Sequence, residues 1–289
     1  MTEQNTRNTF QNLAAIFVII LGISISFIYF YHSNVTRITH QNENYIADIA
    51  AQRTSLISDH FRENIAYIES SAIVLETAFM NEHVDTAKLN VAQESEIDAA
   101  QIEKVGNILR TYEDRFAFDH LRFIDMYGRD YTTGKKIIAA LVAEREYYKE
   151  GVRGKTGMTY ILDSKVTSER QIGFFSPIYQ NGEMAGIAVG FYAEAFIDNL
   201  LKVSIYDSDC DVLLCSRDGT IIYNTGEDIG ADNFLEDLTA FSFSSDADVQ
   251  NVREAFDNRS NTLYNYLDHG ESTVGYVSYV GEIARSEER

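Results

Sequence analysis

The sequence has 289 residues, of which 45% are hydrophobic, and it carries a formal net charge of −20. That hydrophobic content excludes a wholly disordered chain, and the length allows one large domain or two smaller ones with their own cores. Because 44 acidic residues face only 24 basic ones, the chain would repel a phosphate backbone, so we expect no nucleic-acid partner. Residues 201–289 carry 18 acidic and 6 basic residues, which suggests a second unit with a different surface.

The N-terminal region contains a membrane-anchor pattern. Residues 13–31, LAAIFVIILGISISFIYFY, carry no charge. As a helix rising about 1.5 Å per residue they span about 28 Å, close to one hydrocarbon core. The run is too long for the core of a signal peptide, which favours an uncleaved anchor. We therefore expect a cytoplasmic stub over 1–12, a transmembrane helix over 13–31, and the bulk of the chain outside the cytoplasm.

A long helical region is expected over 35–117. Its apolar residues recur at steps of three and four, which places them on one stripe of a helix. Two interpretations stay open: the stripe belongs to a signalling or dimerising helix, or it packs on its own domain. The first run comprises Phe61, Ile65, Ile68, Ala72, Leu75 and Phe79, and a second comprises Val105, Ile108, Tyr112 and Phe116.

The pattern changes to strands over 118–200. HLRFIDMYGRDYTT is typical of strand, turn and strand, and RQIGFFSPIYQNGEMAGIAVGFYAEAF is typical of a hairpin with Asn181-Gly182 as its two-residue turn. Pro177, the only proline, should lie at a sheet edge or a bulge. ALVAEREYYKEGV, between the hairpins, predicts a helix, and AEAFIDNLLK predicts another after the last strand.

The pattern then repeats over 201–289. CDVLLCSRDGTIIYNTG predicts strand, Asp218-Gly219 turn and strand, DVQNVREAFDN a helix, and NTLYNYLDHGESTVGYVSYV a further hairpin. Cys210 and Cys215 would lie about 16 Å apart along a strand, too far for a disulfide, so we expect reduced core cysteines. The predicted fold class is α+β: a transmembrane helix and a long helix, followed by two tandem antiparallel-sheet modules. Because the sequence stops soon after a strand, we expect it to be a fragment.

The stretch EREYYKEGVRGKTG, residues 144–157, ends like a phosphate-binding loop. That loop requires a glycine at position 149, where Lys149 stands, and it should follow a strand and open a helix. This stretch leaves a predicted helix. Gly151, Gly154 and Gly157 are therefore interpreted as turns between a helix and a strand.

No other pattern predicts catalysis or metal binding. The six histidines lack metal-ligand spacing, and Val212 stands where a calcium loop beginning at Asp207 requires glycine. No nucleophile elbow occurs in the sequence. We expect no metal, no cofactor and no enzymatic activity in this chain, and any catalytic output domain would lie beyond residue 289.

Taken together, FIDMYGRDYTT, REYYKEGVRGKTG and GFFSPIYQNGEMAGIAVGFY resemble the double CACHE family, from about residue 35 to the end. These are extracytoplasmic sensor modules built from two PAS-like halves on a long N-terminal helix. The resemblance implies a membrane-distal, ligand-binding PAS-like module over 118–200 and a membrane-proximal one over 201–289, here truncated. It also implies an intracellular output domain such as a cyclase, kinase or chemoreceptor module.

The resemblance also implies site residues. Arg145, Tyr147 and Tyr148 match the family's Arg-x-aromatic-aromatic run, whose guanidinium suits a carboxylate and whose rings suit apolar walls or a cation. Asp163 resembles an acidic position suited to an ammonium group, and Tyr160 would lie beside it. Where the family has an aspartate after the Gly-spaced strand, Tyr192 stands, and Ala139 and Ala140 replace a tyrosine. The alternative is a surface ion pair of Arg145 with Glu144 or Glu150, and core packing of the two tyrosines.

Two functional hypotheses result. In the first, the chain is a single-anchor sensor: the distal module binds a small molecule, the hairpins shift around it, and the long helix carries a displacement to the membrane. We also expect a homodimer that forms through the long helix. In the second, the chain is a membrane-tethered protein-interaction or dimerisation domain without a small-molecule ligand. An enzyme is a third and weaker hypothesis.

Overall fold

The computed structural model describes the following residues: 2–113, 115, 118–132, 137–138, 142–159, 161–163, 170–205, 208–226, 233–236, 238, 243–268 and 271–280. Only the backbone is described for 2–19, 137–138, 163, 203–205, 208–209, 268 and 271–272. Phe116, Tyr160 and the segment Ala139–Ala140, all named above, lie outside the described residues.

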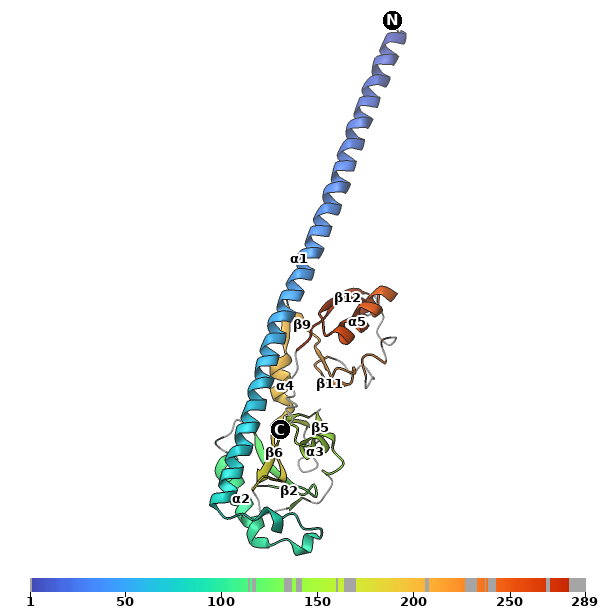
Figure 1. The fold of residues 1–289 in the computed structure, drawn as a ribbon. Coiled ribbons are helices and arrows are strands. Elements are labelled where there is room, and N and C mark those ends of the chain that lie inside the picture. Colours follow the sequence, from blue (N-terminus) through green and yellow to red (C-terminus); the bar gives the residue numbers. More distant parts are fainter. Residues whose placement is uncertain are drawn as a thin grey trace.

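One helix, α1 (Thr2–Asn81), forms the axis of the molecule. Figure 1 shows it projecting beyond the rest of the chain at its N-terminal end, with two modules along its C-terminal half. Short 3-10 turns η1 (Thr86–Lys88) and η2 (Glu94–Glu96) lead into α2 (Ala99–Glu113), which returns beside the distal module. The predicted long helical region over 35–117 is thus two helices joined by a folded connection.

The distal module is built on one antiparallel sheet in the order β3-β2-β1-β7-β6-β4, with β5 also paired to β6. α3 (Glu146–Gly151) lies between β3 and β4 in the chain. The strands are β1 (His120–Asp125), β2 (Asp130–Tyr131), β3 (Ile137–Ile138), β4 (Gly157–Met158), β5 (Leu162–Asp163), β6 (Arg170–Gln180) and β7 (Glu183–Ala193).

The predicted hairpin of β6 and β7 is confirmed. Asn181 and Gly182 have φ values of 54° and 82°, as a two-residue turn with both central residues left-handed requires. Pro177 pairs with Ile187 of β7 on one side. On its other side β4 has already ended, so the missing N–H of Pro177 removes no hydrogen bond between β6 and β4. A register shift follows between Ile178 and Tyr179. Pro177 therefore lies at a local edge beside a bulge, as predicted.

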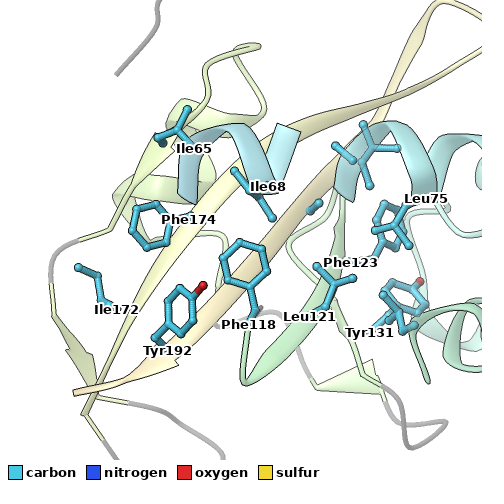
Figure 2. Close-up of a cluster of buried hydrophobic side chains, with 14 of the residues drawn as sticks. Ile65, Ile68, Leu75, Phe118, Leu121, Phe123, Tyr131, Ile172, Phe174 and Tyr192 are labelled. Carbon is cyan, nitrogen blue, oxygen red and sulfur yellow. The ribbon is translucent and has the colours of Figure 1, made fainter. Parts of the chain in front are cut away.

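The face of this sheet toward α1 carries the main core. All six residues of the first predicted stripe, Phe61 to Phe79, are buried, so this part of α1 packs on its own domain. Figure 2 shows Ile65, Ile68 and Leu75 of α1 above side chains of β1, β6 and β7. Phe118, Phe174 and Tyr192 form an aromatic group with centroid distances of 5.1–6.4 Å. This core fixes the sheet against the helix.

The proximal module follows α4 (Glu194–Leu201) and consists of strand pairs and one helix. In the described residues the strands form three separate two-stranded sheets, β8-β9, β10-β11 and β12-β13. Phe234, Leu238 and Val252 form its buried core. The remaining elements are β8 (Val203–Ile205), β9 (Ser208–Cys210), β10 (Leu213–Cys215), β11 (Ile221–Asn224), α5 (Asp246–Asn258), β12 (Thr262–Asp268) and β13 (Glu271–Val277).

Both cysteines are free and half-buried, as expected. Burial raises the pKa of Cys215 to about 12, so its thiol stays protonated and unreactive near neutral pH. Cys215 packs against the proximal core. These residues are therefore structural.

The helix predicted over 140–152 is shorter in the structure, and the membrane span predicted over 13–31 is only partly described. The helix predicted over 140–152 begins only at Glu146, because residues 142–144 form a turn in which Ala143 packs against the left-handed Gly128 of the β1–β2 turn. For the membrane span, no helix in the part described with side chains meets the length and hydrophobicity needed to cross a bilayer. The predicted span 13–31 begins inside residues 2–19, where only the backbone is described.

Candidate functional site

The second face of the distal sheet, turned away from α1, carries the candidate site. Its buried side chains are Ile124 of β1, Phe175 of β6, and Ile187, Val189 and Phe191 of β7. α3 covers this face and contributes Tyr147 and Tyr148. A sheet with helices on both faces has two apolar sides, so this second core is separate from the α1 core.

α3 places the two predicted tyrosines on this face, and the predicted arginine is the residue that precedes the helix. Arg145 is the N-cap residue of the helix, with extended φ and ψ of −72° and 138°, and its side chain is half-buried. Tyr147 and Tyr148 are buried, with exposed fractions of 8% and 6%. The two tyrosines therefore pack in the second core, as the core-packing alternative expects, and a ligand-binding role of the three residues stays a prediction.

The two tyrosines have different surroundings. The ring of Tyr147 lies 6.1 Å from that of Phe175 and 6.4 Å from that of Phe191, the latter edge-on. The Tyr148 hydroxyl donates to the backbone oxygen of Asp125 at 3.1 Å. Burial raises the pKa of Tyr148 to about 12 and raises that of Tyr147 further, so both phenols are neutral donors near pH 7. Tyr148 thus braces the β1–β2 turn, while Tyr147 belongs to the aromatic wall.

A buried ion pair lies on the same face. Arg122 Nη1 donates to Asp130 Oδ2 at 2.7 Å, and the guanidinium carbon lies 5.2 Å from the centre of the Phe191 ring. Burial raises the pKa of Asp130, and the neighbouring Arg122 opposes that rise. Burial raises the pKa of Tyr147, the charge of Asp130 adds to that rise, and the charges of Arg145 and Arg122 oppose it. No motif in the sequence singles out Arg122 or Asp130.

A periodicity argument could have found this pair. In FIDMYGRDYTT the β1–β2 turn sets Asp130 opposite Ile124, so both side chains point to one face, and Arg122 points to that face as well. A charged residue alternating with apolar ones in a strand covered on both faces is a signal in itself. The sequence did not reveal that α3 covers that face.

Tyr192 does not lie with the other predicted residues. Strand alternation sends it to the α1 face, where its hydroxyl donates to Asn64 Oδ1 at 2.7 Å and its ring stacks on Phe196 at 4.2 Å. Its neighbour Phe191 occupies the candidate face. The expectation that Tyr192 shares one site with Arg145 therefore fails on geometry.

The other two predicted residues are not placed by side chain. Tyr160 lies outside the described residues, and Asp163 is described by its backbone alone, as the last residue of β5 paired to Arg170. Both remain predictions. Among the described residues, no three His, Cys, Asp or Glu side chains gather as metal ligands would.

The stretch 144–157 forms no phosphate cradle. Gly154 follows α3 with φ of 87°, and Lys155 is engaged in an ion pair with Glu150, whose pKa the lysine lowers. Glu150 also accepts from Arg153 at 2.9 Å, and Glu144 lies 3.6 Å from Lys149. The loop leaves a helix and enters β4, as predicted from its failure to match the nucleotide motif.

The structure also has an open cleft of about 330 Å³ elsewhere, between α1 and residues 278–280. Its walls are polar, with Thr54, Ser58 and Arg62 on the helix side. No predicted site residue lines it. The candidate site is therefore defined by the second face of the distal sheet and not by this cleft.

The sequence matches no protein-family profile and no curated protein. Solved structures do match its fold. The sensory domain of the Campylobacter jejuni chemoreceptor Tlp3 with isoleucine bound aligns at a TM-score of 0.53 and 16% identity, over 85% of this chain and 91% of that one. The same receptor's ligand-binding domain aligns at a TM-score of 0.53 in complex with L-norvaline, over 82% and 86%, and at 0.51 with L-valine, over 83% and 88%, each at 16% identity.

These alignments include the long helix and both modules, since they cover more than four fifths of each chain. The α+β fold predicted from the sequence, with antiparallel sheets and a long N-terminal helix, is thereby confirmed. The chain therefore shares the fold of these ligand-binding sensory domains of bacterial chemoreceptors.

Proposed function

We propose that the chain is the extracytoplasmic small-molecule sensor region of a transmembrane signal-transduction protein. The observation that carries this proposal is the second face of the distal sheet, where Tyr147 and the Arg122–Asp130 pair adjoin a wall of aromatic rings and Arg145 begins the covering helix α3. A few convergent charged groups on an otherwise apolar surface are typical of small-molecule sites. The fold shared with amino-acid-bound sensory domains supports the same assignment.

The proposed ligand is a small amino acid, carboxylate or amine. The Arg145 guanidinium would pair a carboxylate through parallel hydrogen bonds, and Tyr147 and Phe191 would cover the ligand's apolar part. Tyr160 and Asp163 are proposed to belong to the same site. The distal module is proposed to comprise residues 118–200, and the proximal module residues 201–289. Catalytic output, in this proposal, belongs to another domain.

Arg145→Ala is expected to remove ligand binding. Loss of a charge-assisted contact to a carboxylate weakens binding by about 10- to 100-fold. The measurement is the melting temperature of the full chain in detergent micelles, followed by circular dichroism, across the twenty amino acids and short carboxylates and amines. We expect at least one compound to raise the melting temperature of the parent chain and to leave that of Arg145→Ala unchanged.

Arg153→Ala is the matched control. Arg153 follows the same helix, is exposed, and pairs with Glu150 at 2.9 Å, so its loss should not affect the candidate face. An unchanged response in Arg153→Ala with loss in Arg145→Ala supports the assignment. Absence of any thermal shift in the parent chain, across the whole panel, would contradict the small-molecule function.

The membrane anchor over 13–31 belongs to this proposal. The large apolar side chains of residues 20–31 are exposed, with Phe27 at 68% and Tyr29 at 76%. A helix that exposes apolar side chains all round in water is stable only if another phase or partner covers it. A bilayer fits a helix that projects beyond both modules (Figure 1). In this proposal the modules lie outside the cytoplasm.

The second candidate function, dimerisation through the long helix, has its own supporting observation. On the side of α1 away from the sheet, Leu56, Tyr67, Ile73 and Met80 are exposed. Ile73 is 61% exposed, whereas the preceding Ala72 is 2% exposed and faces the sheet. Ile73 and Met80, seven residues apart, lie on one exposed face of α1, and such a face suits a second copy of the helix.

In vesicle-reconstituted chain, Ile73→Cys is expected to form a disulfide-linked dimer upon mild oxidation, seen on a non-reducing gel. Ala72→Cys, one residue away but turned into the core, is the matched control and should remain monomeric, as should the parent chain with Cys210 and Cys215. Flotation of the same sample with phospholipid vesicles checks the anchor. Equal cross-linking at positions 72 and 73, or a chain that fails to float, would contradict this arrangement.

A further inference from the structure

Two buried aspartates flank the β1–β2 turn, and they differ in how fully their oxygen atoms are used. Asp125 Oδ1 accepts from the backbone N–H groups of Tyr127 and Arg129, at 2.9 and 3.0 Å. Its Oδ2 accepts from Arg129 Nε at 2.6 Å and from the Tyr131 hydroxyl at 3.1 Å. Every side of this carboxylate is occupied, so Asp125 has a complete structural role.

Asp130 is only half used. Its Oδ2 accepts from Arg122, but its Oδ1 is buried and has no hydrogen-bond partner. Across the described residues, one other buried side-chain oxygen shares that condition, Ser278 Oγ in the proximal module. Asp130 is 3% exposed, and a buried carboxylate oxygen without a hydrogen-bond donor costs free energy. The fold supplies hydrogen-bond donors to both oxygens of Asp125 but none to Asp130 Oδ1. This difference indicates that Asp130 Oδ1 has a partner outside the chain.

The surroundings select the chemistry of that partner. An ionised carboxylate only accepts, so the partner must donate. Asp130 points to the face that holds Tyr147 and Phe191, and aromatic rings favour a cation close to them. Arg122, which already pairs with Oδ2, fixes the carboxylate in place and leaves Oδ1 as its available atom. An ammonium group meets all of these conditions.

We propose that Asp130 Oδ1 accepts a hydrogen bond from the ammonium group of the small molecule bound by the distal module, with Arg122 as the positioning residue. This proposal rests on the proposed function and narrows the ligand to a compound with a protonated amine. In this chain Asp130, from the strand pair on the other side of β7, supplies the carboxylate.

The test compares amine-bearing compounds with matched analogues. The full chain in detergent micelles is titrated by calorimetry with each of the twenty amino acids. For each amino acid that binds, the affinities of its deaminated and decarboxylated analogues are then measured. For isoleucine these are 3-methylpentanoate and 2-methylbutylamine. The parent chain should bind the deaminated analogue about 10- to 100-fold more weakly than the amino acid, as loss of a charged hydrogen bond predicts.

Asp130→Asn is the informative variant. The amide oxygen still accepts from Arg122, but an NH₂ group replaces the oxygen that would accept from the ligand. Binding of the amino acid should fall by about 10- to 100-fold, while binding of the deaminated analogue should change little, so that the difference between the two collapses. A purely structural role would weaken both compounds equally. If Asp130→Asn does not fold, Asp130→Glu is titrated in the same way, with the same loss expected because its oxygen atoms are displaced.

Asp119→Asn is the control, since Asp119 is an exposed acid of the same module that accepts from the Ala193 N–H. It should leave all affinities unchanged. Equal affinities for an amino acid and its deaminated analogue in the parent chain, or an unchanged difference between them in Asp130→Asn, would overturn the role of Asp130 while the sensor function stands. Absence of binding to every compound would instead overturn the sensor function itself.

Discussion

Asp125→Ala should unfold the distal module at a much lower urea concentration than the parent chain requires. The carboxylate accepts four hydrogen bonds at 2.6–3.1 Å, two of them from backbone groups of the β1–β2 turn. Its removal leaves the Arg129 guanidinium, with a side chain only 4% exposed, without its anion. Breaking a buried pair in this way costs about 3–5 kcal/mol, a large part of a domain's stability.

The effect should extend beyond the turn. Arg129 Nη2 donates to the backbone oxygen of Leu89 at 2.6 Å, and Tyr148 donates to the backbone oxygen of Asp125. Asp125 therefore joins three parts of the distal module: the connection after α1, the β1–β2 turn and α3. Urea unfolding followed by circular dichroism at 222 nm measures the change in free energy of unfolding.

Asp59→Ala is the matched control for this variant. Asp59 also pairs with an arginine, Arg62, at 3.2 Å, but the carboxylate is 70% exposed. An exposed pair contributes about 0–1 kcal/mol, so this variant should unfold close to the parent chain. Similar midpoints for Asp125→Ala and Asp59→Ala would contradict the view that the buried carboxylate holds the module together.

Local signals in the sequence predicted the turns and hairpins correctly. Asn181-Gly182 and Asp218-Gly219 are short-range signals, because a left-handed backbone at the turn needs residues that tolerate it. Gly182 and Gly219 adopt φ values of 82° and 87° at these turns. The predicted strands on either side, β6 with β7 and β10 with β11, follow from the turns. Such elements depend on few residues and need no knowledge of the fold.

The site was harder to predict, because the distal sheet is covered on both faces. In GIAVGFY, side chains of both registers are apolar, so the alternation of apolar and polar residues that normally identifies the exposed face is missing. Ile187, Val189 and Phe191 face α3, whereas Ala188 and Tyr192 face α1. Nothing in the local sequence distinguishes Phe191 from Tyr192, so the sequence alone cannot show that Tyr192 faces α1. The Arg122–Asp130 pair likewise depends on strand pairing between separate segments.

Gly186→Ala should destabilise the chain more than any other glycine substitution at a turn or strand start of the distal module. Gly186 has a φ of 153°, and a Cβ placed there would lie 2.2 Å from the backbone oxygen of Ile124 and 2.7 Å from the Phe123 ring. A backbone atom cannot rotate away, so β7 would have to separate from β1. Backbone strain of about 1–2 kcal/mol and overpacking of about 1–3 kcal/mol together predict a loss of roughly 3 kcal/mol.

Gly182→Ala separates the two contributions. Gly182 has a φ of 82°, so alanine is strained there as well, but no atom lies within 4 Å of the added Cβ. The free energy of unfolding of Gly182→Ala should therefore fall only by the cost of the backbone strain, about 1–2 kcal/mol. Urea unfolding of both variants measures the difference, and equal losses would mean that the close approach of β7 to β1 does not limit residue size. Because β1 carries Arg122 and β7 carries Phe191, separation of these strands in Gly186→Ala should also weaken ligand binding, whereas Gly182→Ala should bind as the parent chain does.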